Sequence, residues 1–147
     1  MFPAPAMAVP TILLIEDYAD TRTLLAELFR RNGYNIIEAE DGVEGLLKAS
    51  GQQPDLIIMD LALPEMDGVA TARRIHETPK LSQIPIVVVS AYVTAELEAE
   101  VKALGCVATF SKPFDGRELL EKVTEVLQAD SLNVQPTVFP DCDTPLS

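Results

Sequence analysis

Short hydrophobic runs alternate along the chain with stretches of helical periodicity. The runs Thr11–Ile15, Leu56–Met59 and Ile84–Val89 contain no charged residue and are rich in Ile, Leu and Val. Such runs are typical of parallel strands that are covered on both faces. Two weaker runs of the same kind, Tyr34–Ile37 and Val107–Phe110, bring the predicted strands to five.

Between the runs, apolar residues recur every three or four positions and predict helices with one buried face. The clearest sets lie in the first and the last of these stretches: Leu24, Leu25, Leu28 and Phe29, and then Leu119, Leu120, Val123, Val126 and Leu127. We therefore expect these helices to pack on the sheet.

Start and stop residues bound several helices. Asp41 and Asp115 are each followed three positions later by a glutamate, a pattern that favours a helix N-terminus. Gly33 and Gly105 stand where helices should end, because glycine adopts the left-handed conformation at little cost. Strand and helix alternate five times, which predicts an α/β fold: a doubly wound, five-stranded parallel sheet with helices on both faces.

Length and net charge limit the number of domains and the classes of binding partner. The 147 residues suit a single domain, and 11 Lys+Arg against 23 Asp+Glu give a net charge of −12. That charge repels phosphate backbones and anionic lipids, so we expect no nucleic-acid partner and no membrane partner. The two cysteines, Cys106 and Cys142, form neither a metal cluster nor a disulfide framework, which favours a cytoplasmic protein.

Chemistry gathers at the ends of the predicted strands, where ligands of such sheets bind. Glu16 and Asp17 follow the first strand, Asp60 the third, Ser90 the fourth and Lys112 the fifth. Each alone could be a helix cap or a surface group. Together they bring three carboxylates, a hydroxyl and an ammonium to one rim. The carboxylates would repel one another, and a hard cation such as Mg²⁺ removes that conflict.

From about Pro10 to Ala129 the chain resembles the receiver domains of two-component response regulators. The motifs that carry the resemblance are Ile12–Asp17 (ILLIED), Met59–Gly68 (MDLALPEMDG), Ser90–Ala91 (SA) and Lys112–Phe114 (KPF). The resemblance implies the flavodoxin-like strand order 2-1-3-4-5. It also implies a cis peptide bond between Lys112 and Pro113.

The same resemblance assigns a role to each rim residue. Asp60 would be the phosphoacceptor. Lys112 would neutralise the oxygens of the phosphoryl group, and Ser90 would hydrogen-bond one of them. The expected Mg²⁺ ligands are Glu16, Asp17, Asp60 and the backbone carbonyl of Ala62. Beyond the site, Pro64 would turn the loop, Asp67 would cap the next helix and Gly68 would lie in its first turn.

The implied function is phosphorelay signal transduction. A histidine kinase or a histidine phosphotransfer protein would supply the phosphoryl group. The chain would catalyse only its own phosphorylation and dephosphorylation. It would then signal to a protein target through the face of the fourth helix, the fifth strand and the fifth helix. A homodimer that forms on phosphorylation is compatible with this.

The chain divides into three parts in this interpretation. Residues 1–9 would be a flexible lead-in, residues 10–129 the receiver domain, and residues 130–147 a proline-rich, acidic tail that is flexible and too short for an output domain. Alternatively, Val134, Val138 and Phe139 in the tail could add a short extended segment to a sheet edge or a partner.

One departure and several alternatives remain open. Receivers commonly carry an aromatic residue where this chain has Thr109, with Phe110 next to it; Tyr92 is an alternative aromatic.

A dehalogenase-type phosphatase or a metal-dependent nuclease would need a second acid at Ala62, and a nucleotide binder would need a glycine-rich loop. The better alternative is a receiver-like interaction module that no longer needs phosphate.

Overall fold

Five strands and five helices alternate in the computed structural model, which describes residues 9–62, 67–91 and 93–134, the last six by their backbone alone. The strands are β1 (Thr11–Ile15), β2 (Asn35–Ala39), β3 (Leu56–Asp60), β4 (Ile86–Ser90) and β5 (Cys106–Ser111). The helices are α1 (Ala19–Arg31), α2 (Gly42–Gln52), α3 (Gly68–Glu77), α4 (Ala95–Lys102) and α5 (Gly116–Val134).

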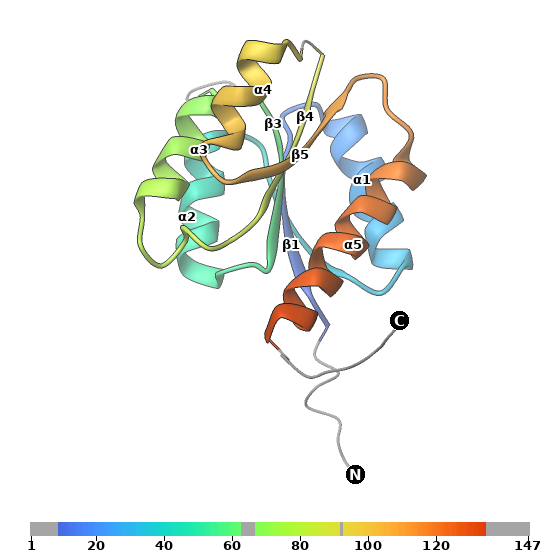
Figure 1. The fold of residues 1–147 in the computed structure, drawn as a ribbon. Helices are drawn as coiled ribbons and strands as arrows, with labels where there is room; N and C mark the ends of the chain where they lie inside the picture. The colour runs from blue at the N-terminus through green and yellow to red at the C-terminus, as the bar shows by residue number, and fades with distance from the viewer. Residues whose placement is uncertain (1–8, 63–66, 92, 135–147) are drawn as a thin grey trace, which may run out of the picture.

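The strands form one sheet in which every pairing is parallel, in the order β2-β1-β3-β4-β5. Helices α1 and α5 cover one face, and α2, α3 and α4 cover the other (Figure 1). The predicted fold class and strand order are therefore confirmed. No helix in the described part of the chain is both long enough and apolar enough to span a bilayer.

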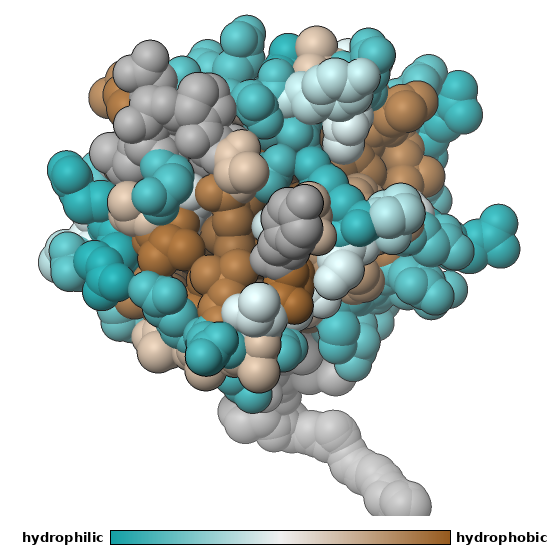
Figure 2. All heavy atoms as spheres, turned by 90° about the horizontal axis from the view of Figure 1, so that it is seen from above, coloured by the Kyte–Doolittle hydropathy of each residue, from teal (hydrophilic) through white to brown (hydrophobic). Residues whose placement is uncertain are grey.

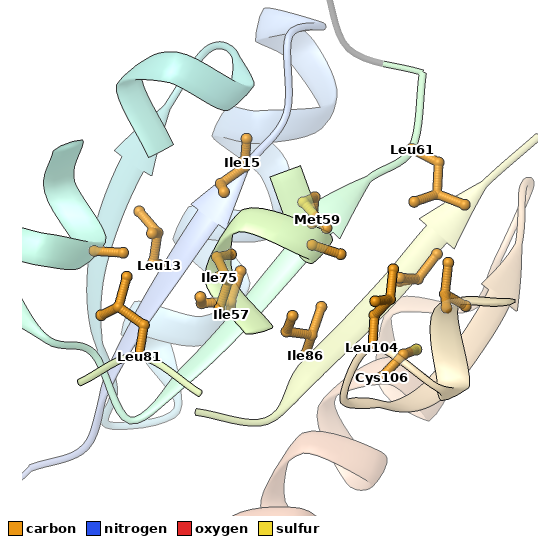
Figure 3. Packing of buried hydrophobic residues seen from close by; sticks show 14 of the residues in the cluster. Leu13, Ile15, Ile57, Met59, Leu61, Ile75, Leu81, Ile86, Leu104 and Cys106 are labelled. Atoms are coloured by element: carbon orange, nitrogen blue, oxygen red, sulfur yellow. The ribbon is translucent and has the colours of Figure 1, made fainter. Parts of the chain in front are cut away.

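Two hydrophobic clusters fill the space between the sheet and its helices. Alternate residues of β1 point to opposite faces, so that Leu13 and Ile15 join the cluster under α2, α3 and α4, shown in Figure 3. Ile12 and Leu14 join the other cluster, where they pack with Phe29 and the α5 residues. Because both faces are buried, the polar side chains of the sheet are confined to its edges.

Strand boundaries differ from the sequence prediction by one or two residues. β4 begins at Ile86 rather than Ile84, because Pro85 lacks an amide hydrogen; its carbonyl still accepts a hydrogen bond from the Ile57 amide at 3.0 Å. β2 continues beyond Ile37 to Ala39, since the charge of Glu38 is held by two arginines instead of ending the strand.

β5 contains a bulge. Ile86 pairs with Cys106 and Val87 pairs with Ala108, so Val107 is the extra residue, and it is 49% exposed. Beyond the bulge, Thr109 pairs with Val88 and lies on the α4 side of the sheet. The next residue, Phe110, packs into the cluster on the α5 side.

Helix caps and stops follow the sequence prediction. Asp41, Asp67 and Asp115 each accept a hydrogen bond at 2.8 Å from an amide two or three residues further on. Gly33 and Gly105 adopt φ of +92° and +97° after their helices. Side-chain caps therefore define where α2, α3 and α5 start, and glycines follow the ends of α1 and α4.

The division of the chain at residues 9 and 129 stays a prediction. α5 continues to Val134, past the second of these positions. Pro64, Tyr92, Cys142 and the rest of the tail from residue 135 lie outside the described residues.

Candidate functional site

The residues predicted for the site meet at the carboxyl edge of the sheet, which is uppermost in Figure 1 and faces the viewer in Figure 2. One carboxylate oxygen from each of Glu16, Asp17 and Asp60 lies within 4.8 Å of the others. Glu16 and Asp60 are only 1% and 4% exposed, whereas Asp17 is open to solvent. Two of the three acids are thus held out of water, where their charges interact strongly.

Lys112 links the two buried acids. Its Nζ donates to Oδ2 of Asp60 at 2.8 Å and to Oε1 of Glu16 at 3.1 Å. The lysine follows β5 directly, and its amide donates to the carbonyl of Ser90 at the end of β4 at 2.8 Å. The next peptide bond, Lys112–Pro113, is cis, as the resemblance implied.

Opposing effects set the pKa values in this cluster. Burial raises the pKa of the Glu16 carboxyl above its ordinary value; the Tyr18 amide opposes this, the Asp60 charge adds to it, and Lys112 opposes it. Burial alone would lower the pKa of the Lys112 ammonium, but its hydrogen bonds to Asp60 and Glu16 outweigh that effect and raise it. Lys112 therefore remains a cation at neutral pH.

The Asp60 carboxylate is fixed on both sides. While Oδ2 accepts from Lys112, Oδ1 accepts from the backbone amide of Ala62 at 3.0 Å. Ser90 is buried at the end of the neighbouring strand, next to the Val89 position that pairs with Asp60. The structure thus places Asp60, Ala62, Ser90 and Lys112 at the neighbouring ends of β3, β4 and β5, while their roles stay predictions.

The donor set suits a hard divalent cation. Oxygens on opposite sides of an octahedral Mg²⁺ ion lie about 4.2 Å apart, close to the spread of the three carboxylates. Three carboxylates against one ammonium leave two negative charges, which a divalent cation would balance. Glu16, Asp17 and Asp60 therefore fit such an ion; whether the carbonyl of Ala62 joins them stays a prediction.

Arg22, which the sequence analysis did not single out, supports the acidic turn formed by Glu16 and Asp17 after β1. Its Nη1 donates to the backbone carbonyl of Glu16 at 2.9 Å, and its Nε lies 3.3 Å from the carboxylate of Glu38. The amide of Tyr18 adds a hydrogen bond to Oε2 of Glu16 at 3.1 Å.

Gly68 is a second residue whose role the sequence did not reveal. Its amide donates to the Leu61 carbonyl at 2.8 Å, so the start of α3 presses on the backbone just after Asp60. A Cβ at this position would lie 2.7 Å from the carbonyl oxygen of Asp60 and would overlap Leu61. Only glycine allows this approach.

Thr109, the departure noted in the sequence, makes a specific contact. Its Oγ1 donates to Oε2 of Glu98 on α4 at 3.1 Å. A small hollow of about 90 Å³ lies beside this bond and is lined by residues of α4 and β5, among them Lys102 and Cys106. Helix and strand are therefore joined by a polar contact over a gap in the packing.

Comparisons with known proteins agree with this geometry. The response regulator receiver domain family matches residues 12–124. Sporulation initiation phosphotransferase F of Bacillus subtilis strain 168 is 32% identical over 120 residues, which are 82% of this chain and 95% of that protein.

Solved structures give the same result. The chemotaxis response regulator CheY4 of Vibrio cholerae is 27% identical with a TM-score of 0.76, covering 81% of this chain and 99% of that one. The receiver domain of sensor histidine kinase PA1611 from Pseudomonas aeruginosa PAO1, which holds a magnesium ion in its active site cleft, is 27% identical with a TM-score of 0.75 and covers 82% and 99%. The chain therefore belongs to the receiver domain family of two-component response regulators, whose members are phosphoacceptors.

Proposed function

We propose that Asp60 is the residue that accepts the phosphoryl group. The observation that carries this proposal is the setting of its carboxylate: the Asp60 side chain is 6% exposed, and the carboxylate lies between the Lys112 ammonium and the Ala62 amide. The carboxylate is an anion without the help of a base, so it can attack phosphorus directly.

The reaction we propose is an exchange of one bond for another. A carboxylate oxygen of Asp60 forms a bond to the phosphorus of a phosphohistidine while the N–P bond breaks. The electron pair of that bond goes to the imidazole nitrogen, which takes up a proton. The product is an aspartyl phosphate; its hydrolysis by water releases inorganic phosphate and restores the Asp60 carboxylate.

Residues around Asp60 would lower the activation free energy of phosphoryl transfer, both by neutralising charge and by positioning the reacting groups. Mg²⁺, held by Glu16, Asp17 and Asp60, would supply positive charge to an oxygen of the phosphoryl group. Lys112 already touches Asp60 and would turn its ammonium toward a second oxygen. The Ser90 hydroxyl would donate to a third.

Competing enzyme classes fit the site less well. A phosphatase with an aspartate nucleophile would need a second acid two positions after Asp60, where the chain has Ala62. A receiver-like module without phosphate chemistry would have no need for a buried acidic pair bridged by an ammonium, which is costly to hold out of water.

The phosphodonor reaches Asp60 over the α1 side of the rim in our proposal. A groove of about 580 Å³ lies between α1 and the start of α5, and Lys112 itself is part of its wall. Most of the remaining wall is apolar, with Leu24, Leu28 and Phe114 among its residues. Such a surface suits the apolar face of a helix from a histidine kinase or a histidine phosphotransfer protein.

The downstream target binds a different surface in our proposal, the face formed by α4, β5 and α5. The Ser90 carbonyl is bonded to the Lys112 amide, and β4 leads from Ser90 toward α4. A phosphoryl group on Asp60 would draw the Ser90 hydroxyl toward it and bias the position of α4. The hydrogen bond between Thr109 and Glu98 would couple a shift of α4 to β5.

Intact mass measurement tests this function. The protein is incubated with acetyl phosphate and Mg²⁺, and the expected result is the gain of one HPO₃ unit that is stable to acid and labile to base. Asp60→Asn should abolish the gain, and omission of the divalent cation should prevent it. Asp20→Asn, a change at an exposed aspartate of α1, is the matched control and should label normally. Undiminished labelling of Asp60→Asn would refute the assignment.

A further inference from the structure

Arg22 spans the gap between the acidic turn and the edge of the sheet. Its side chain is 14% exposed, although arginine is among the residues most often found in solvent. One end of the guanidinium holds the carbonyl of Glu16 at 2.9 Å, and the Nε faces Glu38 at 3.3 Å. A single side chain therefore ties the loop that carries two of the candidate ligands to β2.

Glu38, the partner of Arg22, is itself held firmly. Its other carboxylate oxygen lies 3.2 Å from Nη2 of Arg30, and its backbone carbonyl accepts from Nζ of Lys48 at 2.6 Å. β2 also supplies the Ala39 carbonyl, which accepts from the Glu16 amide at 3.0 Å. The anchor of Arg22 is thus part of the sheet.

We propose that Arg22 is a positioning residue for the divalent-cation site: it does not touch the cation but fixes the backbone from which Glu16 and Asp17 project. The inference rests on the proposed function. With the Glu16 carbonyl clamped and its amide in the sheet, both carboxylates are held close together before any cation arrives. Without the clamp, their mutual repulsion would drive the exposed Asp17 outward.

Two simpler roles make different predictions. If Arg22 contributed only positive charge, lysine would replace it fully, since lysine keeps the charge but not the planar guanidinium. If it only stabilised the fold, any loss of Mg²⁺ affinity in a variant would be accompanied by a matching fall in its thermal midpoint. Arg30 is a matched control because it pairs with the same Glu38 carboxylate and does not reach Glu16.

Calorimetric titration of the unphosphorylated protein with Mg²⁺ separates these cases. Arg22→Met should weaken Mg²⁺ binding roughly 10-fold or more, the usual effect of removing a group that orients metal ligands. Arg22→Lys should recover only part of the affinity, and Arg30→Met should bind as the wild type does. Equal affinity in wild type and Arg22→Met would overturn the positioning role, as would full recovery by lysine or an equal loss in Arg30→Met.

A kinetic readout complements the titration. The rate of labelling by acetyl phosphate is measured against Mg²⁺ concentration; Arg22→Met should need more Mg²⁺ for half the maximal rate while keeping that maximum. A lower maximum with unchanged Mg²⁺ dependence would overturn the proposal.

Glu38→Gln provides a second variant in case Arg22→Met does not fold. It keeps the size of the anchor but removes its charge, and it should weaken Mg²⁺ binding relative to the wild type. Wild-type affinity in Glu38→Gln would count against the anchor. If the wild type itself bound no Mg²⁺, the proposed function would fail together with this inference, whereas the outcomes above overturn the inference alone.

Discussion

Gly68 packs directly against the backbone of Asp60: a Cβ at residue 68 would lie 2.7 Å from the carbonyl oxygen of Asp60. Gly68→Ala should therefore push the loop after β3 away from α3, at a cost of about 1–3 kcal/mol in the free energy of unfolding. Because the displaced backbone carries the proposed phosphoacceptor, the rate of labelling by acetyl phosphate should fall even at temperatures where the variant is fully folded.

Gly51→Ala is the matched control for that change. Gly51 lies in α2 and a Cβ there would meet nothing within 4 Å, so alanine should stabilise the helix slightly and leave labelling unchanged. Normal labelling of Gly68→Ala would show that the contact does not position Asp60.

Mg²⁺ should raise the thermal stability of the protein, because a ligand that binds only the folded state stabilises it. At a concentration of about 100 times the Kd, the gain is about 2.7 kcal/mol. Asp17→Asn should abolish this response. In the absence of Mg²⁺ it should not lower the midpoint, since it removes a repulsive charge from the cluster. Calorimetric scans with Mg²⁺ and with a chelator test both statements, with Asp20→Asn as the control that keeps the response.

The aspartyl phosphate should be long-lived, because the methyl group of Ala62 can neither orient a water molecule nor donate a proton next to Asp60. Ala62→Asn should accelerate phosphate loss several-fold. The measurement is the decay of the phosphorylated mass after acetyl phosphate has been removed. An unchanged decay rate in the variant would contradict this explanation.

Thr109→Val should loosen α4. The change keeps the shape of the side chain but removes the hydroxyl that donates to Glu98, which costs about 0.5–1.5 kcal/mol for an average hydrogen bond and less at an exposed one. Backbone amides of α4 should exchange with deuterium faster, while those of β1 and β3 stay protected.

Thr124→Val is the control for α4 loosening. It removes the hydrogen bond between Thr124 and Tyr34 at 2.9 Å on the α5 side of the sheet. It should leave α4 exchange at the wild-type rate. Identical α4 exchange in Thr109→Val and in the wild type would mean that the hydroxyl does not hold the helix.

Cys106 should resist alkylation in the folded protein. Burial raises the pKa of its thiol, so the reactive thiolate is scarcer at any given pH than in the unfolded chain. In a Cys142→Ser background at pH 8, iodoacetamide should react much faster with Cys106 after denaturation in urea than before. Equal rates in the two states would refute the shielding.

Sequence patterns predicted the elements better than their ends. Hydrophobic runs identified the central strands β1, β3 and β4 clearly because these are buried on both faces. The runs for the edge strands β2 and β5 are weaker because most of their residues are only partly buried. The hydrophobic runs misplaced the ends of β2 and β4, since Glu38 reads as a break although its charge is paired, and Ile84 reads as strand although Pro85 cannot donate.

The candidate site divides in the same way. Residues at strand ends could be predicted because parallel strands bring their carboxyl ends together, which is why Glu16, Asp60 and Lys112 were found. Arg22 and Gly68 could not, since both act on backbone carbonyls. A carbonyl is the same at every residue, so no pattern of side chains indicates which one a neighbour will contact.

The bulge in β5 gives this part of the chain a tolerance for changes in length. Deletion of Val107 would leave the pairing from Val87 and Ala108 onward as it is, so that Lys112 would still reach Asp60. An insertion after Ala108 would instead turn every later side chain of the strand to the other face. The loss of one residue between α4 and the site can therefore be accommodated at position 107 without turning the Lys112 ammonium away from Asp60.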